Sequence, residues 1–397
     1  MQSAESSPLI AIACGGTGGH LFPGLAVGEE LVQRGCAVML LVSPKEVDQQ
    51  GVAAVRDMQV VTLPAVGLGR GNVFQFARGF LESYRAARKV FAPRVPQAVL
   101  AMGGFTSAPP VLAGRKLRAK TFLHESNAVP GRANRFLARF VSQAFIGFPS
   151  CASRLRTGDV LLTGTPVRPH LTPGDSEGAR MALGLQPKRE TLLVMGGSQG
   201  ASAINQLILR CLPDLQKQLP DSQILHLTGP RDFEKVRESY RAAAIPAVVR
   251  PFLSEMELAL SAATVAVSRS GASSLAEFAA MRVPAILIPF PAATDNHQFH
   301  NARSLVETGA ARLLGEQRST PENLTSMIVD LMTNVPERQR LIAALAAWHR
   351  PDAAAAIAEA VLKKNQLFTR RREPRVTSSG APRKEALEFA TQLKSEA

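Results

Sequence analysis

Thr17 and His20 are the polar side chains of a glycine-rich stretch, GGTGGH (15–20), that follows the apolar run Leu9–Ala13. A glycine turn between a strand and a helix lets backbone N–H groups and the positive end of the helix approach an anion closely. A histidine beside such a turn can take up a proton near neutral pH. The pattern favours an anion or pyrophosphate loop or an acceptor-site loop; a structural turn with a core-facing histidine is the alternative.

Two well-known phosphate-binding loops do not fit this stretch. A dinucleotide fingerprint needs a third glycine where Leu21 stands, and the acidic residue expected after the second strand is absent, since Val38–Val42 is followed by Ser43 and Pro44. A Walker loop needs glycine, lysine and then serine or threonine, which the stretch lacks.

A second polar group, HESN (124–127), follows a later candidate strand. His124 and Glu125 can act as acid and base, or they can support the loop. Asn127 can hydrogen-bond a hydroxyl or an acetamido group. Gly103 and Gly104 follow the preceding strand, so we expect both groups where the strand ends open into a cleft.

The second half of the chain has its own glycine loop and a serine-rich loop. Ser198, in GGSQG (196–200), suits a phosphate oxygen, or alternatively caps a helix. SRSGASSLAE (268–277) follows a buried strand and can hold a diphosphate. Glu277 can accept both hydroxyls of a ribose, because a carboxylate has two acceptor oxygens; the alternative is a capping box with Ser274.

A polar quartet, DNHQ (295–298), opens a helix after another candidate strand. Paired donors and acceptors of this kind suit sugar hydroxyls, and the alternative is a helix capped by Asp295. His297 and His300 lack a third ligand at metal spacing, so we predict no metal site.

Regularly alternating strands and helices must position these residues. Candidate strands of the first half are Leu9–Ala13, Ala37–Val42, Val60–Leu63, Ala98–Ala101, Thr121–Leu123 and Gln143–Phe145. Helical patterns lie between them at Pro23–Arg34, Val73–Val90, Phe105–Lys116 and Arg132–Phe140. Such alternation predicts a parallel sheet covered on both faces.

The second half repeats the scheme after a linker rich in proline, glycine and threonine at Gly164–Gly174. Its candidate strands are Thr191–Met195, Gln223–Leu227, Ala247–Val249, Thr264–Val267 and Ala285–Ile288. Two helical stretches, Glu337–Ala347 and Asp352–Lys364, follow, and the basic polar segment beyond Phe368 is interpreted as mostly disordered. We therefore expect two α/β domains that face each other across a cleft.

Composition limits the partners of this chain of 397 residues, which is long enough for two domains. A net charge of +14 favours anionic partners, but aromatic residues are only 5%, too few for base-stacking platforms, so nucleic acid is not predicted. The four scattered cysteines fit reduced thiols in the cytoplasm. We expect neither a signal peptide nor a membrane-spanning segment.

A basic and apolar stretch, NVFQFARGFLESYRAARKV (72–90), can bind an anionic membrane face. Its apolar residues Val73, Phe74, Phe76 and Phe80 alternate with basic ones, Arg70, Arg78, Arg85, Arg88 and Lys89. Arg115, Lys116, Arg118 and Lys120 add positive charge in the same half. An ordinary core-facing helix with a solvated basic side is the alternative.

With these motifs assembled, the chain resembles the MurG family of peptidoglycan glycosyltransferases. The matching motifs, in the order of the family, are GGTGGHLFPGLA (15–26), MGGF (102–105), HESNAVPG (124–131), GTPVR (164–168), GGSQGA (196–201), SRSGASSLAE (268–277) and PFPAATDNHQFHNA (289–302). They extend over residues 9 to about 360.

The resemblance implies a GT-B fold, with two Rossmann-like parallel-sheet domains. Residues 1–166 would bind the acceptor and the membrane, 167–350 would bind UDP-N-acetylglucosamine (UDP-GlcNAc), 351–368 would cross back as a helix, and 369–397 would be a tail. The implied reaction is inverting transfer of N-acetylglucosamine (GlcNAc) to the 4-hydroxyl of undecaprenyl-pyrophosphoryl-N-acetylmuramoyl-pentapeptide, at the cytoplasmic face of the inner membrane. No cofactor is implied, and other cell-wall synthesis proteins are candidate partners.

The resemblance also implies roles for individual residues. His20 would be the base, and His124 and Glu125 are candidates on the acceptor side. Donor contacts carried over by position are Thr17, Gly18, Gly19, Asn127, Arg168, Ser198, Leu253, Ala272, Ser273, Ser274, Leu275, Ala276, Glu277 and Gln298. Leu253 would use its backbone against the uracil, Glu277 would hold the ribose and Gln298 the sugar hydroxyls.

The chain departs from the family at Ser126 and His297, where glutamine is frequent, so recognition of the sugar near His297 is open. Two other hypotheses remain. Another enzyme on this plan, such as a UDP-sugar 2-epimerase or a diacylglycerol glycosyltransferase, would share the glycine loops, and an epimerase would need no lipid acceptor. A basic nucleic-acid-binding protein would leave both glycine loops unexplained.

Overall fold

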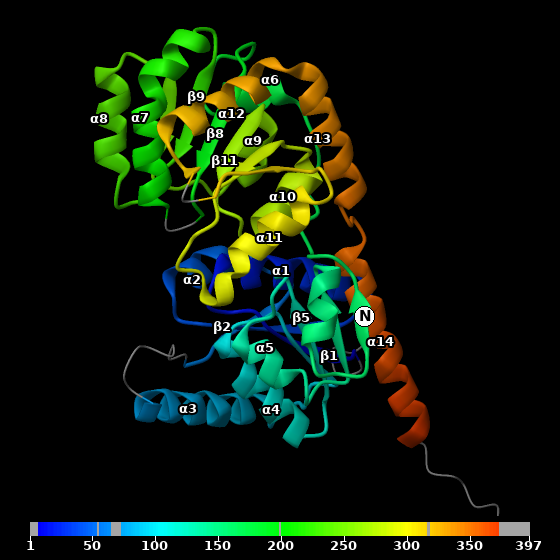
Figure 1. The fold of residues 1–397 in the computed structure, drawn as a ribbon. Helices are drawn as coiled ribbons and strands as arrows, with labels where there is room; N and C mark the ends of the chain where they lie inside the picture. The colour runs from blue at the N-terminus through cyan, green and yellow to red at the C-terminus, as the bar shows by residue number, and fades with distance from the viewer. Residues whose placement is uncertain (1–6, 54, 65–72, 198–199, 316–317, 373–397) are drawn as a thin grey trace, which may run out of the picture.

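Two parallel sheets, one in each half of the chain, form the framework of the protein (Figure 1). The computed structural model describes residues 7–53, 55–64, 73–197, 200–315 and 318–372. Helices cover both faces of each sheet, so the central strands are mostly apolar, whereas the edge strands β3, β7 and β10 are partly exposed. All five residues of the first strand, for example, are buried. The predicted α/β class with two Rossmann-like domains is confirmed.

The N-terminal sheet has the strand order β3-β2-β1-β4-β5-β6-β7, and all its neighbouring strands pair in parallel. Its strands are β1 (Leu9–Ala13), β2 (Ala37–Val42), β3 (Gln59–Thr62), β4 (Ala98–Ala101), β5 (Lys120–Glu125), β6 (Gln143–Ile146) and β7 (Val160–Leu162). The helices between them are α1 (Gly18–Gln33), α2 (Glu46–Val52), α3 (Val73–Phe91), α4 (Ala108–Lys116) and α5 (Arg132–Leu137), with short turns η1 (Phe105–Ser107) and η2 (Pro149–Arg154).

The C-terminal sheet has the order β10-β9-β8-β11-β12-β13 and is also parallel. Its strands are β8 (Thr191–Met195), β9 (Gln223–Leu227), β10 (Ala247–Arg250), β11 (Val265–Ser268), β12 (Ala285–Leu287) and β13 (Arg312–Leu313). Its helices are α6 (Ser176–Ala182), α7 (Ser202–Gln218), α8 (Phe233–Ala242), α9 (Met256–Ala262), α10 (Ala272–Met281), α11 (His297–Val306), α12 (Pro321–Thr333) and α13 (Val335–Trp348), with the turn η3 (Thr294–Asn296).

The chain passes between the domains twice, and the two passages touch. After α13 the chain returns as α14 (Ala353–Arg372), which runs down beside the N-terminal domain in Figure 1 and buries Ile357, Ala358 and Val361 against its core. The first passage includes Gly164, whose φ is +83°. A Cβ there would lie 2.6 Å from the Cβ of Arg350 in the second passage, so only glycine allows this approach.

Several expected boundaries are wrong for identifiable reasons. Helix α1 begins at Gly18 rather than at Pro23, which lies inside it. The expected helix Phe105–Lys116 is a 3₁₀ turn followed by α4, and the one expected at Arg132–Phe140 ends at Leu137. The short strands β7 and β13, of three and two residues, have too little apolar pattern to be recognised in the sequence.

Candidate functional site

The first glycine loop is held by side chains from its own domain. One carboxylate oxygen of Asp48 accepts from the backbone N–H of Gly16 at 2.6 Å and from that of Ser43 at 3.0 Å. The ammonium group of Lys45 donates to the carbonyl oxygen of Gly16 (2.9 Å). Asp48 is fully buried, and it therefore occupies the Gly16 N–H that an anionic ligand would use. Sequence reasoning missed Asp48, because a helix-borne aspartate 32 residues from the loop carries no local signal.

His20 lies in the first turn of α1, where the two glycine motifs of the N-terminal domain meet. Its Nδ1 is 3.1 Å from the hydroxyl of Thr17. A Cβ on Gly103 would lie 2.8 Å from Cδ2 and 2.9 Å from Nε2 of the ring, so only glycine lets the backbone pack this closely against the imidazole. Burial lowers the pKa of His20 to about 4, and the imidazole is neutral at pH 7.

His124 and Glu125 are both buried and fully engaged with backbone or loop partners. Nε2 of His124 donates to the carbonyl oxygen of Gly164 (2.9 Å), so Nδ1 is the acceptor for the Ser126 hydroxyl at 3.3 Å. The carboxylate of Glu125 accepts at 2.9 Å from four groups: the N–H and amide of Asn127, the N–H of Gly131 and the amide of Asn134. These contacts favour the loop-supporting alternative for both residues.

On the opposite domain, Arg168 connects Glu277 to the first helix of the N-terminal domain. Nη2 of Arg168 lies 3.9 Å from a carboxylate oxygen of Glu277, and its guanidinium carbon lies 4.6 Å from the centroid of the Phe22 ring. Burial raises the pKa of Glu277 to about 7, and the nearby Arg168 partly opposes this shift. The carboxyl group of Glu277 therefore ionises more completely when a bound ligand donates hydrogen bonds to it, because such bonds stabilise the charged form.

The serine-rich loop leads directly into α10, and Gly271 is the residue at the N-cap position. Ser274 lies within the helix and makes no capping bond, so the alternative of a capping box with Glu277 is wrong. Leu275, Ala276 and Ala272 are buried in the core. The Ser273 hydroxyl donates to the carbonyl oxygen of Gly19 in the other domain at 3.1 Å.

A cavity of about 510 Å³ opens between the second glycine loop and the β12–α11 connection. It is lined by Gly196, Gly200, Ala201, Arg231, Arg269 and Gln298, among others. The Arg269 guanidinium donates to the carbonyl oxygens of Ile288 and Pro289 and lies over the Phe290 ring. Arg231 and Arg269 are cations that suit phosphate oxygens. Arg269 lies in the predicted diphosphate loop SRSGASSLAE (268–277), whereas Arg231 was missed because a single arginine in a loop carries no pattern.

The remaining predicted residues have varied positions. Gln298 accepts from the N–H of Phe290 through its side-chain oxygen (2.9 Å), and Leu253 is half-buried against the C-terminal core. Asp295 pairs with Arg135 instead of capping α11, so that alternative is wrong. Ser198 lies outside the described residues, as does the tail from 373.

The described part of the chain contains neither a membrane-spanning helix nor a cluster of metal-ligating side chains. No helix in it is both long and apolar enough to span a bilayer. Within the same residues, no three histidine, cysteine, aspartate or glutamate side chains gather as they would around a metal ion.

Two facing Rossmann-like domains with parallel sheets define a GT-B fold. Family models match both halves: the glycosyltransferase family 28 N-terminal domain over residues 10–146 and the family 28 C-terminal domain over 191–372. The chain belongs to glycosyltransferase family 28, within its MurG branch.

Individual relatives support this assignment. UDP-N-acetylglucosamine--N-acetylmuramyl-(pentapeptide) pyrophosphoryl-undecaprenol N-acetylglucosamine transferase of Anaeromyxobacter dehalogenans is 37% identical over 374 residues, covering 89% of this chain and 92% of that protein. The crystal structure of Acinetobacter baumannii MurG has a TM-score of 0.67 and 28% identity, covering 90% of this chain and 99% of that chain. A structure described as a putative UDP-N-acetylglucosamine 2-epimerase from Listeria monocytogenes (TM-score 0.67, 15% identity, covering 92% of this chain and 98% of that one) shares the fold alone.

Proposed function

We propose that this enzyme transfers GlcNAc from UDP-GlcNAc to the 4-hydroxyl of undecaprenyl-pyrophosphoryl-N-acetylmuramoyl-pentapeptide (lipid I), forming lipid II. The observation that carries the proposal is the apposition of the two half-sites: the first turn of α1, which bears His20, contacts the serine loop of α10 through Ser273 and Gly19. The relationship to transferases of this name over nine-tenths of the chain supports it.

The two domains divide the work in this proposal. Residues 1–166 bind the acceptor, 167–350 bind the donor, and 351–368 fasten the second domain to the first. The 4-hydroxyl attacks C1 of the donor sugar, its proton passes to a base, and UDP leaves with the bonding electron pair. This single displacement inverts the anomeric carbon and gives a β-1,4 link.

His20 is the base in this mechanism. When Nδ1 carries the hydrogen and donates it to the Thr17 hydroxyl, Nε2 is the nitrogen with the lone pair that accepts the proton. With a pKa of about 4 the imidazole is unprotonated at neutral pH and can accept a proton, but it is a weak base in the free enzyme, because an ideal base has a pKa near the working pH. The developing imidazolium is stabilised by Asp48, whose negative charge raises the pKa of His20 against the effect of burial.

The donor lies in the C-terminal half of the cleft. Glu277 accepts the ribose hydroxyls, Leu253 presents its backbone to the uracil, and Gln298 contacts the sugar. The N-terminus of α10 and the second glycine loop stabilise the diphosphate as it leaves, because their backbone N–H groups need no reorganisation. Asn127, Arg168, Ser198 and the α1 residues Thr17–Gly19 complete the contacts.

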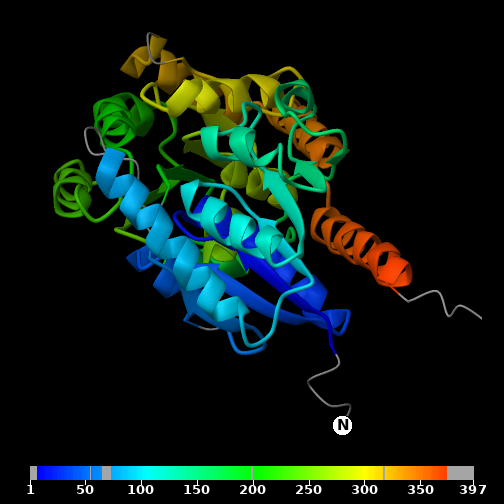
Figure 2. The same ribbon diagram turned by 90° about the horizontal axis from the view of Figure 1, so that it is seen from below.

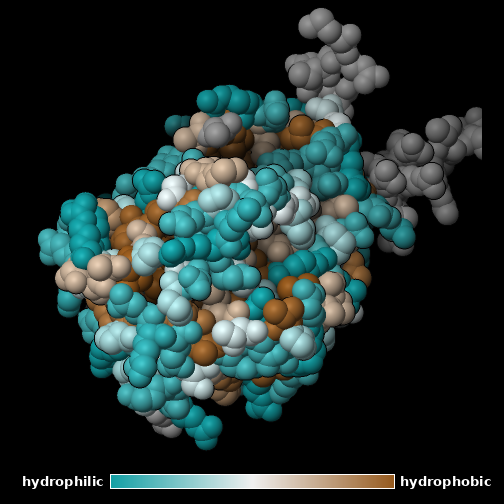
Figure 3. Space-filling view, turned by 90° about the horizontal axis from the view of Figure 1, so that it is seen from above, coloured by the Kyte–Doolittle hydropathy of each residue, from teal (hydrophilic) through white to brown (hydrophobic). Residues whose placement is uncertain are grey.

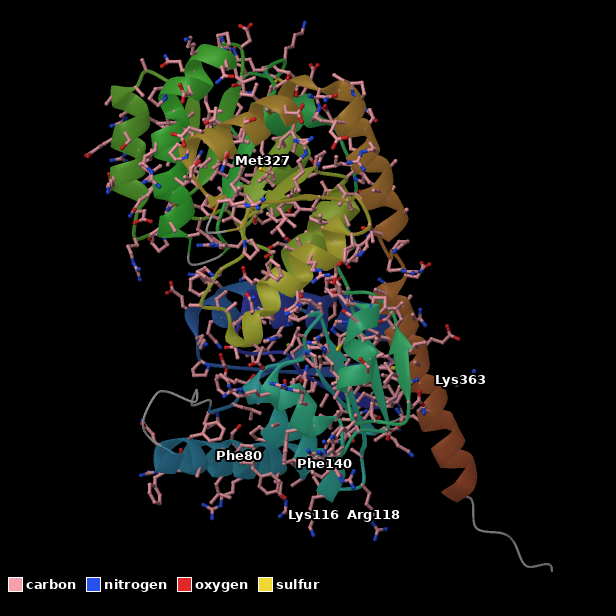
Figure 4. The ribbon with its side chains drawn as sticks, in the orientation of Figure 1. Phe80, Lys116, Arg118, Phe140, Met327 and Lys363 are labelled. Atoms are coloured by element: carbon pink, nitrogen blue, oxygen red, sulfur yellow. The ribbon has the colours of Figure 1, made fainter. Side chains whose placement is uncertain are left out.

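The lipid-linked acceptor requires a membrane surface, and α3 and α4 offer one. They lie side by side across the near face of Figure 2, and Figure 4 shows Lys116 and Arg118 at the same lower end of the molecule as Phe80 and Phe140. Phe74 is 90% exposed and Leu81 44%. The opposite end, seen in Figure 3, is mainly hydrophilic with small scattered apolar groups. We therefore place this enzyme at the cytoplasmic face of the inner membrane as a peripheral protein.

One assay tests the proposed function. The protein is incubated with UDP-GlcNAc, with and without a short-chain lipid I analogue, and UDP and lipid II are measured. UDP release that depends on the analogue supports transfer, whereas appearance of the manno epimer without acceptor would establish an epimerase. His20→Ala should lower turnover at least 100-fold and leave UDP binding within about threefold, since a base contributes roughly 10²–10⁴-fold to rate. Unchanged turnover removes His20 from the base role.

A further inference from the structure

Asn301 on α11 connects three parts of the cleft, and no role above uses it. Its side chain is fully buried although it lies where the two domains meet. Its Oδ1 accepts from the backbone N–H of Ala128 at 2.8 Å, and its Nδ2 donates to Oδ1 of Asn127 at 3.0 Å. The same Nδ2 donates to the carbonyl oxygen of Ser270 at 3.2 Å. One carboxamide thus bonds to both the N-terminal domain and the serine loop.

The contact with Asn127 fixes the orientation of a residue proposed to bind the donor. The amide nitrogen of Asn127 donates to Glu125, and its amide oxygen accepts from Asn301. A carboxamide has two N–H donors and two lone pairs on oxygen, so one donor and one acceptor of Asn127 stay available for a sugar. The bond from Asn301 also decides which end of the Asn127 amide is oxygen, because only oxygen can accept it.

Other contacts next to Asn301 lead to the same region. The Ser270 hydroxyl donates to the backbone carbonyl oxygen of Gln298 (2.8 Å), so the serine loop that Asn301 holds is also bonded to the start of α11. At the rim, Arg135 of α5 pairs with Asp295. Asp295 and Asn296 both have positive φ, at +52° and +51°, and this unusual backbone directs Asp295 toward the N-terminal domain.

We propose that Asn301 is a positioning residue that orients the Asn127 carboxamide for the donor sugar when the two domains are closed. The bonds to Asn127 and Ala128 join different domains and form only in the closed arrangement, whereas the bond to Ser270 lies within the C-terminal domain. Closure therefore assembles the sugar-binding amide, and an open enzyme holds Asn127 only through Glu125. The identity of the sugar in this inference rests on the proposed function. The three hydrogen bonds of Asn301 do not depend on that function.

The first test separates positioning from folding. Asn301→Asp keeps an acceptor for Ala128 but replaces the donor to Asn127 and Ser270 with an oxygen. Asn301→Leu has a similar volume and no polar group. We expect both variants to lower kcat 10- to 100-fold while UDP affinity, measured by calorimetry, stays within about threefold. Arg303→Gln, an exposed change on the same helix, is the matched control and should behave as wild type.

A double-mutant cycle tests whether Asn301 acts through Asn127. Asn127→Ala combined with Asn301→Asp should be no slower than the slower single variant. Fully multiplicative losses, or a parallel fall of kcat, UDP affinity and the unfolding midpoint, would overturn the proposal in favour of a purely structural asparagine.

Closure is read out without activity by energy transfer between dyes on Arg139→Cys and Lys217→Cys, since the four native cysteines are all buried. UDP-GlcNAc should raise the efficiency of energy transfer in the parent protein, and it should raise it less in the Asn301→Asp variant. An equal rise in both overturns the proposal. A parent that closes and binds but transfers no GlcNAc would refute the proposed function and leave this inference standing.

Discussion

The hydroxyl of Ser273 donates a hydrogen bond to the carbonyl oxygen of Gly19. This oxygen lacks its usual helical partner because residue 23 of α1 is a proline. In a regular helix the N–H of residue 23 would bond to this oxygen, but residue 23 is proline and has no N–H. A proline inside the first helix of one domain thus exposes an acceptor that the other domain uses.

The first prediction concerns this contact. Pro23→Ala supplies a helical N–H that competes for the Gly19 carbonyl oxygen, and Ser273→Ala removes the donor. A single hydrogen bond is worth about 1 kcal/mol net, so each change should raise the KM for UDP-GlcNAc about three- to tenfold. Pro23→Ala should also raise the thermal midpoint of the isolated protein, because it repairs the helix. A KM unchanged in both variants refutes a functional role for the contact.

A second prediction follows from the raised pKa of Glu277. The pKa of about 7 in the folded protein lies above the ordinary glutamate value of 4.5, so the carboxyl of the free enzyme is partly protonated at neutral pH. The carboxylate is the form that accepts two ribose hydroxyls, and UDP affinity should therefore increase as pH rises from 6 to 8. Glu277→Gln should bind UDP at least tenfold more weakly and lose this dependence. Glu322→Gln, on an exposed part of α12, is the control; a parent affinity independent of pH contradicts the prediction.

The pH dependence of stability is the third prediction. Burial lowers the pKa of His226 to about 3, and its ring nitrogens bond to the Tyr240 hydroxyl (2.9 Å) and the Asn205 side-chain oxygen (3.0 Å). Because the pKa in the folded protein lies below the ordinary histidine value of 6.5, the unfolded chain binds the extra proton, and stability should fall as pH drops from 6.5 toward 3. Glu277 acts in the opposite sense, since its raised pKa removes stability as pH increases from 4.5 through 7.

Urea unfolding at pH 5 and pH 8 measures this effect. His226→Gln cannot take up the proton, so its loss of stability on acidification should be smaller than that of the parent, although its stability at pH 8 is lower. An identical difference between the two pH values in both proteins would exclude His226 as a source of the acid sensitivity.

The fourth prediction concerns membrane binding. Phe74→Ser removes an exposed aromatic side chain from α3, and Arg85→Gln with Arg88→Gln removes two exposed charges. Each change should reduce sedimentation with vesicles containing anionic lipid, and the charge variants should respond less to salt. Met181→Ser on α6 is the matched control, since Met181 is 60% exposed in the C-terminal domain. Equal binding by all variants would exclude this face.

The sequence was sufficient to predict the two sheets, because each buried strand is an apolar run bounded by glycine or polar residues. β1, β2, β4, β8 and β9 begin and end where the pattern indicated. The predicted start of α1 is wrong, because proline is common in the first turn of a helix and rare inside one. Here the Ser273 hydroxyl replaces the hydrogen bond that Pro23 cannot donate to Gly19.

The geometry around the candidate site was less predictable. Motifs identified His20 and Glu277, but the partners that hold them, Asp48 and Arg168, are distant in sequence. Asn301 lies inside a recognised motif and was not singled out, since an asparagine in a helix gives no sign of the three bonds that tertiary packing gives it.

The meeting of Gly164 with Arg350 has a mechanical consequence. The two links between the domains touch at one point and act together as a hinge, so the domains can rotate relative to each other but cannot slide or separate. A protease cut in either link would leave the other intact, and the halves would remain aligned. A bulky residue at Gly164 would push the two links apart and change the angle between the domains.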